Sequence, residues 1–230
     1  MCGRYSLKEA PDVLKSQFQF NTSLNIQPRY NIAPSQLAPI VTKDETNRKL
    51  SLLKWGVPSR EQTNLSSKNY FINVRAETLL ENYSLKKACT NRRCLVLADG
   101  FYEWKKEYNK NQPYRIHLAN NNAFAFAGLW EEEYLCNSDE AKQKNFAIIT
   151  TEALPSISHI HKRMPVILKR EDYASWLDGD PKLAFPTLKS CTGLELRSYK
   201  VSPMLGNTEN DSAALLNKYC LLYTSDAADE

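Results

Sequence analysis

The sequence predicts an α+β fold: a single β-rich domain, built as a mixed sheet or an open barrel with short peripheral helices. Apolar runs of strand length outnumber the stretches with helical spacing, and they do not alternate regularly with helices as in a βαβ series. No Gly/Ser linker, repeat or internal low-complexity tract interrupts the chain of 230 residues. One domain is therefore expected over residues 1–217.

Two helices are expected in the N-terminal half of the chain. Ser6-x-x-Glu9 resembles a capping box ahead of a short helix that ends at Phe18, with Pro11 in its first turn. The leucine spacing of residues 76–89 predicts the second helix. Both helices are short, so they are expected at the periphery of the sheet.

The strands are predicted from short apolar runs bounded by polar residues. Residues 92–101 predict a buried strand that ends in a turn at Asp99-Gly100. The other strands are expected at 38–43, 52–57, 123–130, 146–151, 164–168 and 194–202. Residues 218–230 form an atypical acidic tail that is either non-native or an ordinary frayed terminus, and they carry no functional argument.

The composition is that of an ordinary globular protein, with 42% hydrophobic and 24% charged residues. No apolar run approaches the ~20 residues that span a bilayer, and the first residues do not resemble a secretory signal. We therefore expect no membrane partner. The expected location is the cytoplasm, in association with the nucleoid, or the nucleus in a eukaryote, and the expected state is a monomer.

The six cysteines include no CxxC pair, which argues against a zinc site and against a disulfide framework. We expect reduced thiols, no metal and no cofactor. The net charge is only +4, so the placement of the basic residues matters more than their sum. They form two clusters, each a basic face or a solvated surface: Lys86, Lys87, Arg92 and Arg93, and Lys162, Arg163, Lys169 and Arg170.

The chain begins MCGR, and a methionine ahead of a small residue is commonly trimmed. Cys2 then carries a free α-amine beside its thiol. An α-amine has a pKa of about 7.7–8.0, so roughly a tenth of it is nucleophilic at neutral pH. The amine forms a Schiff base with an aldehyde, and the thiol closes a thiazolidine ring. Residue 2 alone leaves open an incidental cysteine and the thiol nucleophile of an N-terminal-nucleophile hydrolase.

Several further blocks follow MCGR in order along the chain. They are RYNIAPSQ (29–36), LKWGVP (53–58), FINVRAET (71–78), ADGFYEW (98–104), ISHIHKRMP (157–165) and KVSPMLGNTENDSAALL (200–216). Together they closely resemble the SRAP family, the SOS-response-associated peptidase domain, over residues 2–217. The chain departs from the family pattern in two places: a short polar span between Gly56 and Asn73, and the segment MLGN (204–207). Both departures are expected to affect the shape of the DNA groove.

The resemblance implies a metal-free covalent sensor and shield of abasic sites in single-stranded DNA. Cys2 is implied to crosslink the ring-opened deoxyribose through a thiazolidine, and Asn73 to orient the chain start. Glu103 is implied to shuttle protons, and its aromatic neighbours are expected to desolvate the carboxyl and raise its pKa. His161 is implied to stabilise the opened sugar's hydroxyl.

The resemblance also implies guanidinium groups on phosphates and apolar platforms beside unstacked bases. The expected residues are Arg4, Arg75 and Arg163 on phosphates, Asn31, Pro34 and Trp55 in the groove, and Thr150 near the site. The alternatives are surface salt bridges for the arginines, a core position for Trp55 and a structural strand position for Thr150.

Two other functions stay open at this point. Cys2, His161 and Glu103 also fit a peptidase, or an autopeptidase that removes residues ahead of the cysteine, although no other peptidase motif supports it. The second alternative is a single-stranded-DNA-binding module without covalent chemistry.

Overall fold

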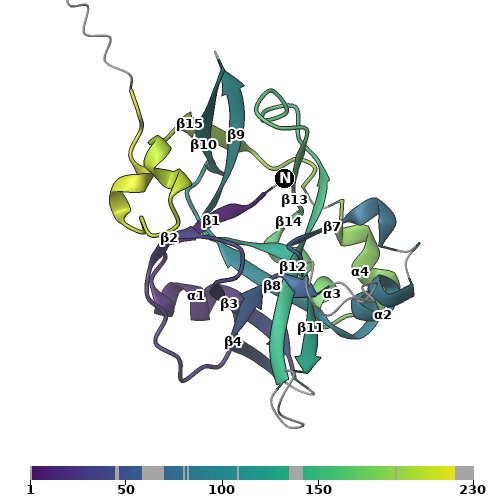
Figure 1. The fold of residues 1–230 in the computed structure, drawn as a ribbon. Helices are drawn as coiled ribbons and strands as arrows, with labels where there is room; N and C mark the ends of the chain where they lie inside the picture. Colours follow the sequence, from purple (N-terminus) through teal and green to yellow (C-terminus); the bar gives the residue numbers. More distant parts are fainter. Residues whose placement is uncertain are drawn as a thin grey trace, which may run out of the picture.

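The computed structural model contains two large β-sheets, one closed and one open, with helices around them (Figure 1). The structure describes residues 2–44, 47–58, 70–79, 81, 83–107, 109–134, 142–189 and 191–220. Both sheets contribute to one main hydrophobic core, in which Tyr5 of the open sheet packs edge-on against Phe126 of the barrel. The predicted α+β, β-rich fold with short peripheral helices is confirmed.

The closed sheet is a barrel of five strands. They are β3 (Leu37–Lys43), β4 (Arg48–Trp55), β8 (Arg93–Ala98), β11 (Phe124–Tyr134) and β12 (Lys142–Glu152). β12 pairs with β4 in parallel, and antiparallel pairing links β4 to β3, β3 to β8, β8 to β11 and β11 back to β12. The mixed sheet closes because β11 and β12, of 11 residues each, are long enough to pair along both edges.

Short strands extend the barrel next to the site described below. β7 (Asn73–Arg75) and β13 (Arg163–Pro165) pair with β12, and β14 (Ile167–Leu168) pairs with β11. A separate two-stranded hairpin joins β5 (Val57–Pro58) to β6 (Tyr70–Phe71). The strand predicted at 164–168 is thus two strands, because Val166 donates to Ile149 O at 2.8 Å while its own carbonyl accepts from Ala127.

The open sheet is antiparallel, with the strand order β15-β10-β9-β1-β2. Its strands are β1 (Arg4–Leu7), β2 (Arg29–Ile32), β9 (Gly100–Glu107), β10 (Lys110–Leu118) and β15 (Leu196–Lys200). The segment after β15 holds the 3-10 helices η3 (Pro203–Gly206) and η4 (Ala213–Leu216). Leu205 and Leu215 of this segment form a second, smaller core with Tyr102.

The chain passes from the barrel to the open sheet at Asp99, inside the predicted turn. β8 ends at Ala98 and β9 begins at Gly100. The buried Asp99 carboxylate accepts from the Ser6 hydroxyl at 2.7 Å and from Arg115 Nη2 at 2.9 Å. A buried carboxylate is tolerated when it is paired and hydrogen-bonded in this way. The three side chains fix β1, β9 and β10 to one another.

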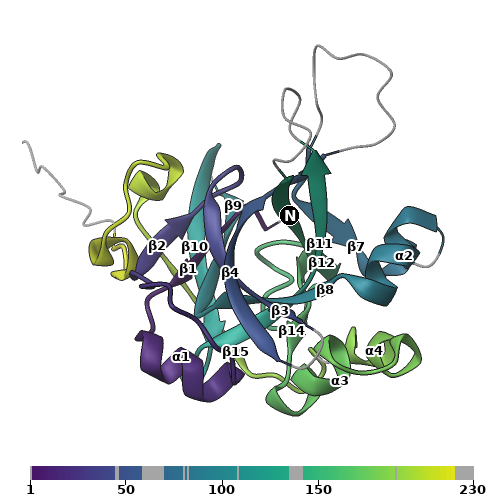
Figure 2. The ribbon, with the colours of Figure 1, turned by 90° about the horizontal axis from the view of Figure 1, so that it is seen from below.

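The helices lie outside the strands (Figure 2). They are α1 (Pro11–Phe18), α2 (Tyr83–Asn91), α3 (Tyr173–Leu177) and α4 (Pro181–Thr187), with the 3-10 helices η1 (Ala76–Thr78) and η2 (Arg170–Asp172). The predicted helix ending at Phe18 is confirmed, but its capping box is wrong: Ser6 lies in β1 and Ala10 is the N-cap. The helix predicted over 76–89 is divided into η1 and α2.

A stability prediction follows from Gly128, where β11 passes closest to β8. An added Cβ would lie 2.7 Å from Val96 Cγ2 and 2.8 Å from Cys94 Sγ. We expect Gly128→Ala to lower the free energy of unfolding by about 1–3 kcal/mol, as overpacking does, in urea denaturation. Gly206→Ala is the control, because nothing lies within 4 Å of its Cβ position. Equal stability of the two variants would contradict the packing argument.

Candidate active site

Cys2 stands directly before β1, where this strand enters the open sheet. The pairing of Arg4 with Tyr102 directs the residues before Arg4 toward the Glu103 side of β9. The Cys2 side chain is fully buried, and its thiol donates to Arg4 O at 3.6 Å. Burial, and next the charge of Glu103, raise the pKa of the Cys2 thiol well above its usual value. The sulfur is therefore held as a thiol.

Asn73 opens β7 and holds the backbone of Cys2. Parallel pairing with β12 sets Asn73 beside Ile148, and its Nδ2 donates to Cys2 O at 2.8 Å. Its Oδ1 is buried and accepts no hydrogen bond from the described residues. A buried acceptor without a donor is costly, so this oxygen is suited to receive one.

Glu103 and His161 form the ionisable pair of the site. Glu103 is 3% exposed, and this burial raises its pKa to about 7, as its sequence context predicted. His161 Nδ1 lies 3.9 Å from Glu103 Oε1 and accepts the Arg163 N–H at 3.0 Å. Burial lowers the pKa of His161. Near neutral pH the pair thus consists of a carboxyl group that can gain or lose a proton and an imidazole that is neutral.

Arg163, at the start of β13, is bound to protein groups beside this pair. Its Nη1 and Nη2 donate to the two Glu77 carboxylate oxygens, both at 3.0 Å, and Nη2 also donates to Thr150 O at 2.7 Å. Thr150 is fully buried, which does not support its predicted DNA contact; its carbonyl instead accepts from Arg163. The two parallel bonds to Glu77 are the geometry in which a guanidinium also binds a phosphate.

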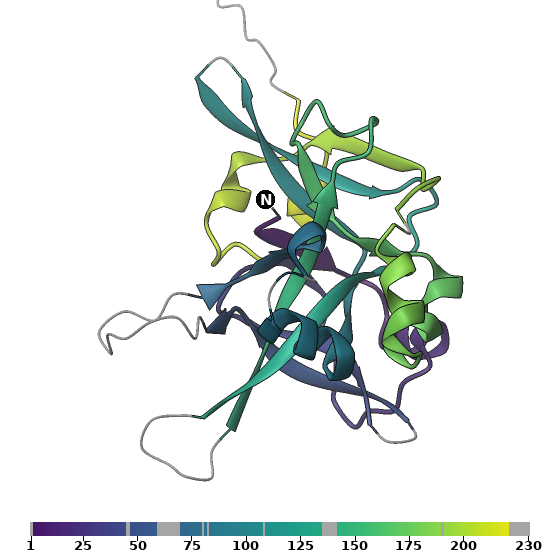
Figure 3. The same cartoon turned by 90° about the vertical axis from the view of Figure 1, so that its right-hand side faces the viewer.

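Arg4 and Asn31 contact the C-terminal segment rather than an open DNA surface. Figure 3 shows this segment, in yellow, beside the start of the chain. Arg4 donates to Leu205 O at 2.7 Å and to Gly206 O at 3.2 Å. Asn31 is fully buried, and its Nδ2 donates to three carbonyl groups between residues 205 and 210. The predicted DNA contact of Asn31 is wrong because of this burial. The Arg4 guanidinium is occupied by protein carbonyls, which does not support a phosphate contact.

The remaining predicted DNA ligands differ in accessibility. Trp55 is 1% exposed, stacks on Phe146 at 6.1 Å and donates to Ile72 O, so its prediction as a DNA platform is wrong and it belongs to the core. Pro34 is half-buried. Arg75 is exposed, and its positive charge adds to the Arg163 hydrogen bond in lowering the pKa of Glu77. Pro34 and Arg75 remain predicted DNA contacts.

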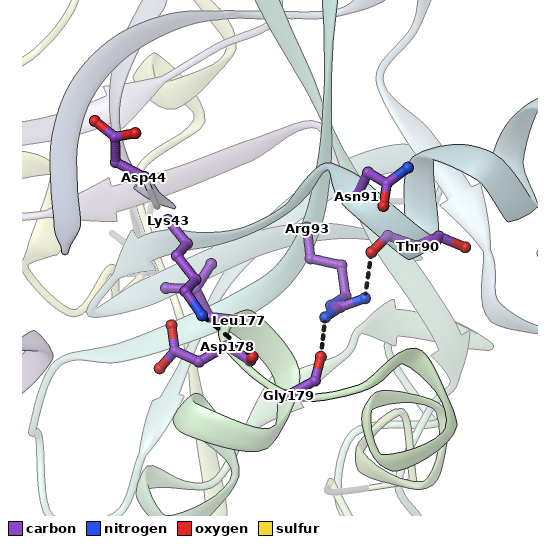
Figure 4. A pocket seen from close by; sticks show the side chains of 8 residues that line it. All are labelled: Lys43, Asp44, Thr90, Asn91, Arg93, Leu177, Asp178 and Gly179. Carbon is purple, nitrogen blue, oxygen red and sulfur yellow. Dashed lines mark hydrogen bonds between the residues drawn. The ribbon is translucent and has the colours of Figure 1, made fainter. Parts of the chain in front are cut away.

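In the first basic cluster, Lys86 and Lys87 are exposed, whereas Arg93 is buried. Arg93 is 7% exposed and donates to carbonyls at the ends of α2 and α3, those of Cys89, Thr90, Trp176 and Gly179. Figure 4 shows it in the wall of a cavity of ≈ 340 Å³, where Lys43 Nζ donates to Asp178 O at 3.3 Å. The residues that line this cavity come from other elements than those around Cys2. In the second basic cluster, Lys162 is exposed beside the site.

Within the described ranges, no group of three or more His, Cys, Asp and Glu side chains could hold a metal ion. None of the helices in the described part of the chain is long and apolar enough to cross a membrane. The described cysteines are free thiols: Cys2, Cys89, Cys94, Cys191 and Cys220. Cys136 and residues 221–230 of the predicted tail lie outside the described residues.

Sequence reasoning missed two features that shape the site. Glu77, the partner of Arg163, lies inside the FINVRAET block, where a carboxylate two residues after Arg75 was an available signal. The buried Asp99–Arg115 pair was hidden because β10 was not predicted, although Arg115 stands in the strand-like run YRIHL.

On this barrel-and-sheet scaffold Asn73 binds the Cys2 backbone, Glu103 acts on the Cys2 thiol and His161 lies beside Glu103, a set of groups suited to cysteine chemistry. The chain belongs to the family described as "SOS response associated peptidase (SRAP)", whose model matches residues 1–208. The resemblance seen in the sequence blocks is thereby confirmed.

Among its relatives, "Abasic site processing protein YoqW" of Bacillus subtilis is 36% identical over 229 residues, covering 95% of this chain and 100% of that protein. "Abasic site processing protein HMCES" of Rattus norvegicus is 29% identical over 227 residues, 82% of this chain and 64% of that protein. A solved Bacteroides thetaiotaomicron protein shares the fold, with a TM-score of 0.79, 19% identity and coverage of 95% and 100%. A phage-related Bordetella bronchiseptica protein has a TM-score of 0.69 and 29% identity, with coverage of 87% and 94%.

The raised pKa of Glu103 predicts a pH-dependent stability. Between its ordinary value of 4.5 and about 7, the folded protein keeps a proton that the unfolded chain releases, so stability falls as pH rises through this window. Glu103→Gln removes this loss. Relative to wild type, we expect the variant to gain on the order of 3 kcal/mol in unfolding free energy between about pH 4 and pH 8.

The control for this measurement is Glu107→Gln, further along β9. Hydrogen bonds from Lys200 and Tyr114 lower the pKa of Glu107, so ionisation of Glu107 makes wild type more stable as pH rises. The pH dependence that Glu107→Gln removes therefore has the opposite sign to that of Glu103. Urea denaturation at both pH values distinguishes the two. Equal pH dependence in wild type and Glu103→Gln would contradict the assignment.

Proposed function

We propose that this protein processes abasic sites by covalent capture, as a sensor and shield of the lesion in single-stranded DNA. After removal of Met1, the Cys2 amine and thiol close a thiazolidine with the aldehyde of the ring-opened deoxyribose. The names of the relatives, abasic site processing proteins, support the substrate. The single observation that carries the chemistry is the buried Glu103 carboxyl, with a pKa of about 7, close enough to raise the pKa of Cys2.

The proposed reaction releases one water. The neutral Cys2 amine attacks the aldehyde carbon C1′, and the hydroxyl of the resulting carbinolamine leaves as water after protonation by Glu103. Loss of this water leaves a protonated imine and the Glu103 carboxylate. The sulfur of Cys2 then adds to the imine carbon, and the thiol proton returns to Glu103, which leaves a neutral ring nitrogen. Because the ring closure is intramolecular, it is strongly favoured over attack by an external thiol.

Asn73 is the positioning residue of this scheme. Its Nδ2 already binds Cys2 O at 2.8 Å, and its buried Oδ1 has no donor among the described residues. In the processed chain the Cys2 amine supplies a donor at this place, with its lone pair left for the aldehyde. His161, neutral and 3.9 Å from Glu103, is suited to donate to the opened sugar's hydroxyl.

The DNA backbone is proposed to run past Arg75 and Arg163. Arg75 is exposed, and its charge is close enough to Glu77 to add to the Arg163 hydrogen bond in lowering the pKa of that carboxyl. The Arg75 guanidinium can bind a phosphate in place of this interaction. Arg163 can do so when a phosphate replaces the Glu77 carboxylate, whose side chain is 51% exposed.

The peptidase alternative is less well supported by the electrostatics of Cys2. A cysteine nucleophile is activated by a lowered pKa that makes it a thiolate. Here burial and Glu103 act in the opposite direction. A thiol that stays protonated until an imine forms next to it fits the aldehyde chemistry better.

The covalent step is tested with an abasic single-stranded oligonucleotide and the processed protein, by denaturing gel. We expect a stable shifted band for wild type, and for Cys2→Ser only an unstable adduct that borohydride traps, since the amine then acts alone. Cys89→Ser, a buried thiol elsewhere, is the control and should crosslink like wild type. Binding without any covalent band would instead favour the non-covalent binding module.

A second prediction concerns Asn73. Asn73→Ala removes the hydrogen bond to Cys2 O, and we expect about 10²-fold slower crosslinking, the order of loss that misplacement of a reacting group causes. Single-turnover kinetics measure the rate. Asn111→Ala, at an exposed position of β10, provides the matched control. An unchanged rate for Asn73→Ala would rule out the positioning role.

A further inference from the structure

Tyr70 and Phe71 of β6 expose aromatic rings next to the site. Their exposed fractions are 40% and 52%, among the largest of any aromatic side chain in the described structure. Two exposed rings in so short a strand are unusual for a surface that only contacts water, and exposed apolar groups of this kind mark binding sites. Because side chains alternate along a strand, the Tyr70 ring lies on the face of β6 toward Gly56 and the Phe71 ring on the other face.

The hairpin that carries the rings is anchored to the barrel. Val57 and Pro58 of β5 pair with Phe71 and Tyr70. The carbonyl of Ile72, the next residue, accepts from Trp55 Nε1 at 2.9 Å and from the Ile148 N–H at 3.0 Å. The rings are therefore presented on a fixed backbone, which limits the entropy lost when a ligand stacks on them.

The same segment leads directly into the site. Phe71 precedes Asn73 by two residues and Arg75 by four, and Asn73 holds the carbonyl of Cys2. At a rise of about 3.3 Å per residue in extended chain, Phe71 lies about 7 Å along the backbone from Asn73. A nucleotide adjoining one captured at Cys2 is within reach of the Phe71 ring.

The surroundings of the rings are basic. Lys54 Nζ lies 5.7 Å from the centre of the Tyr70 ring, and Arg75 is exposed further along the chain. Aromatic rings beside cations are the composition of grooves that bind single-stranded nucleic acid, where bases stack and cations follow the phosphates. The positive charges of Lys54 and Arg75 are spread along the segment. This spacing fits an extended nucleic acid strand better than a small molecule.

We propose that the Phe71 ring is a stacking platform for the base next to the abasic site, while Tyr70, on the opposite face of β6 beside Lys54, lines the path of the strand on that side. The proposal rests on the proposed function and extends it to the selection of the DNA strand. An abasic site leaves its neighbouring base without a stacking partner on one side, and an exposed ring replaces the missing partner. The platform thereby holds the strand in register with Cys2 before the covalent step.

The test measures binding and crosslinking separately. Binding uses the Cys2→Ser background and an intact single strand containing 2-aminopurine, whose fluorescence is quenched by stacking. Crosslinking uses wild-type Cys2 and an abasic strand with 2-aminopurine beside the lesion. The variants are Phe71→Leu, Tyr70→Leu and the double variant, with Phe71→Trp to restore the ring.

We expect the double variant to bind the intact strand at least about tenfold more weakly, with less quenching, while Phe71→Trp binds like the parent. At saturating strand, the crosslinking rate of the leucine variants should approach that of wild type, because the chemistry is not touched. Leu183→Ala, an exposed apolar residue of α4, is the control and should change nothing.

The outcomes are distinguishable. If wild type crosslinks but the leucine variants bind and quench as it does, the platform is refuted and the proposed function stands, and the rings are left for a protein partner. If wild type does not crosslink, the proposed function fails. Weaker binding by Phe71→Trp, which keeps an aromatic ring, would also refute stacking, since a ring at this position would then not be sufficient.

Discussion

The site depends on the antiparallel pairing of β1 with β9. This pairing brings the start of the chain beside Glu103, and the buried Ser6–Asp99–Arg115 network holds it in register. Gly100 is part of the same constraint, because a Cβ there would lie 2.8 Å from Arg115 Cζ. A one-residue slip of β1 would turn its side chains to the other face and separate Cys2 from the carboxyl. The contacts that hold β1 in the open sheet therefore also place Cys2 beside Glu103.

Burial has two consequences at the centre of the site, and both favour the same order of events. It keeps the Cys2 sulfur protonated and it brings the pKa of Glu103 to about 7. An α-amine, with a pKa of about 7.7–8.0, is then the more available nucleophile near neutral pH. In the proposed reaction the amine therefore acts first and the sulfur second, which is the order that a thiazolidine requires. The C-terminal segment, tied to Arg4 at Leu205, closes this side of the molecule.

The sequence predicts local features better than it predicts exposure. The β-rich fold, α1 and the bend at Asp99 follow from periodicity and turn chemistry, and the raised pKa of Glu103 follows from its aromatic neighbours. Trp55 and Asn31 were misassigned because motif position does not reveal burial, which arises when distant strands pack. β1 and β10 were missed because polar residues such as Arg115 interrupt them, and their partners, Asp99 among them, are visible only after the sheet has formed.

The most direct test of the account is the intact mass of the product formed by the processed protein and an abasic strand. The account predicts one species, without reducing agent, whose mass is the sum of the two reactants less one water, and whose adduct maps to Cys2. A product that retains the water, that maps to a lysine, or that appears only after borohydride reduction would contradict the proposed ring closure at Cys2.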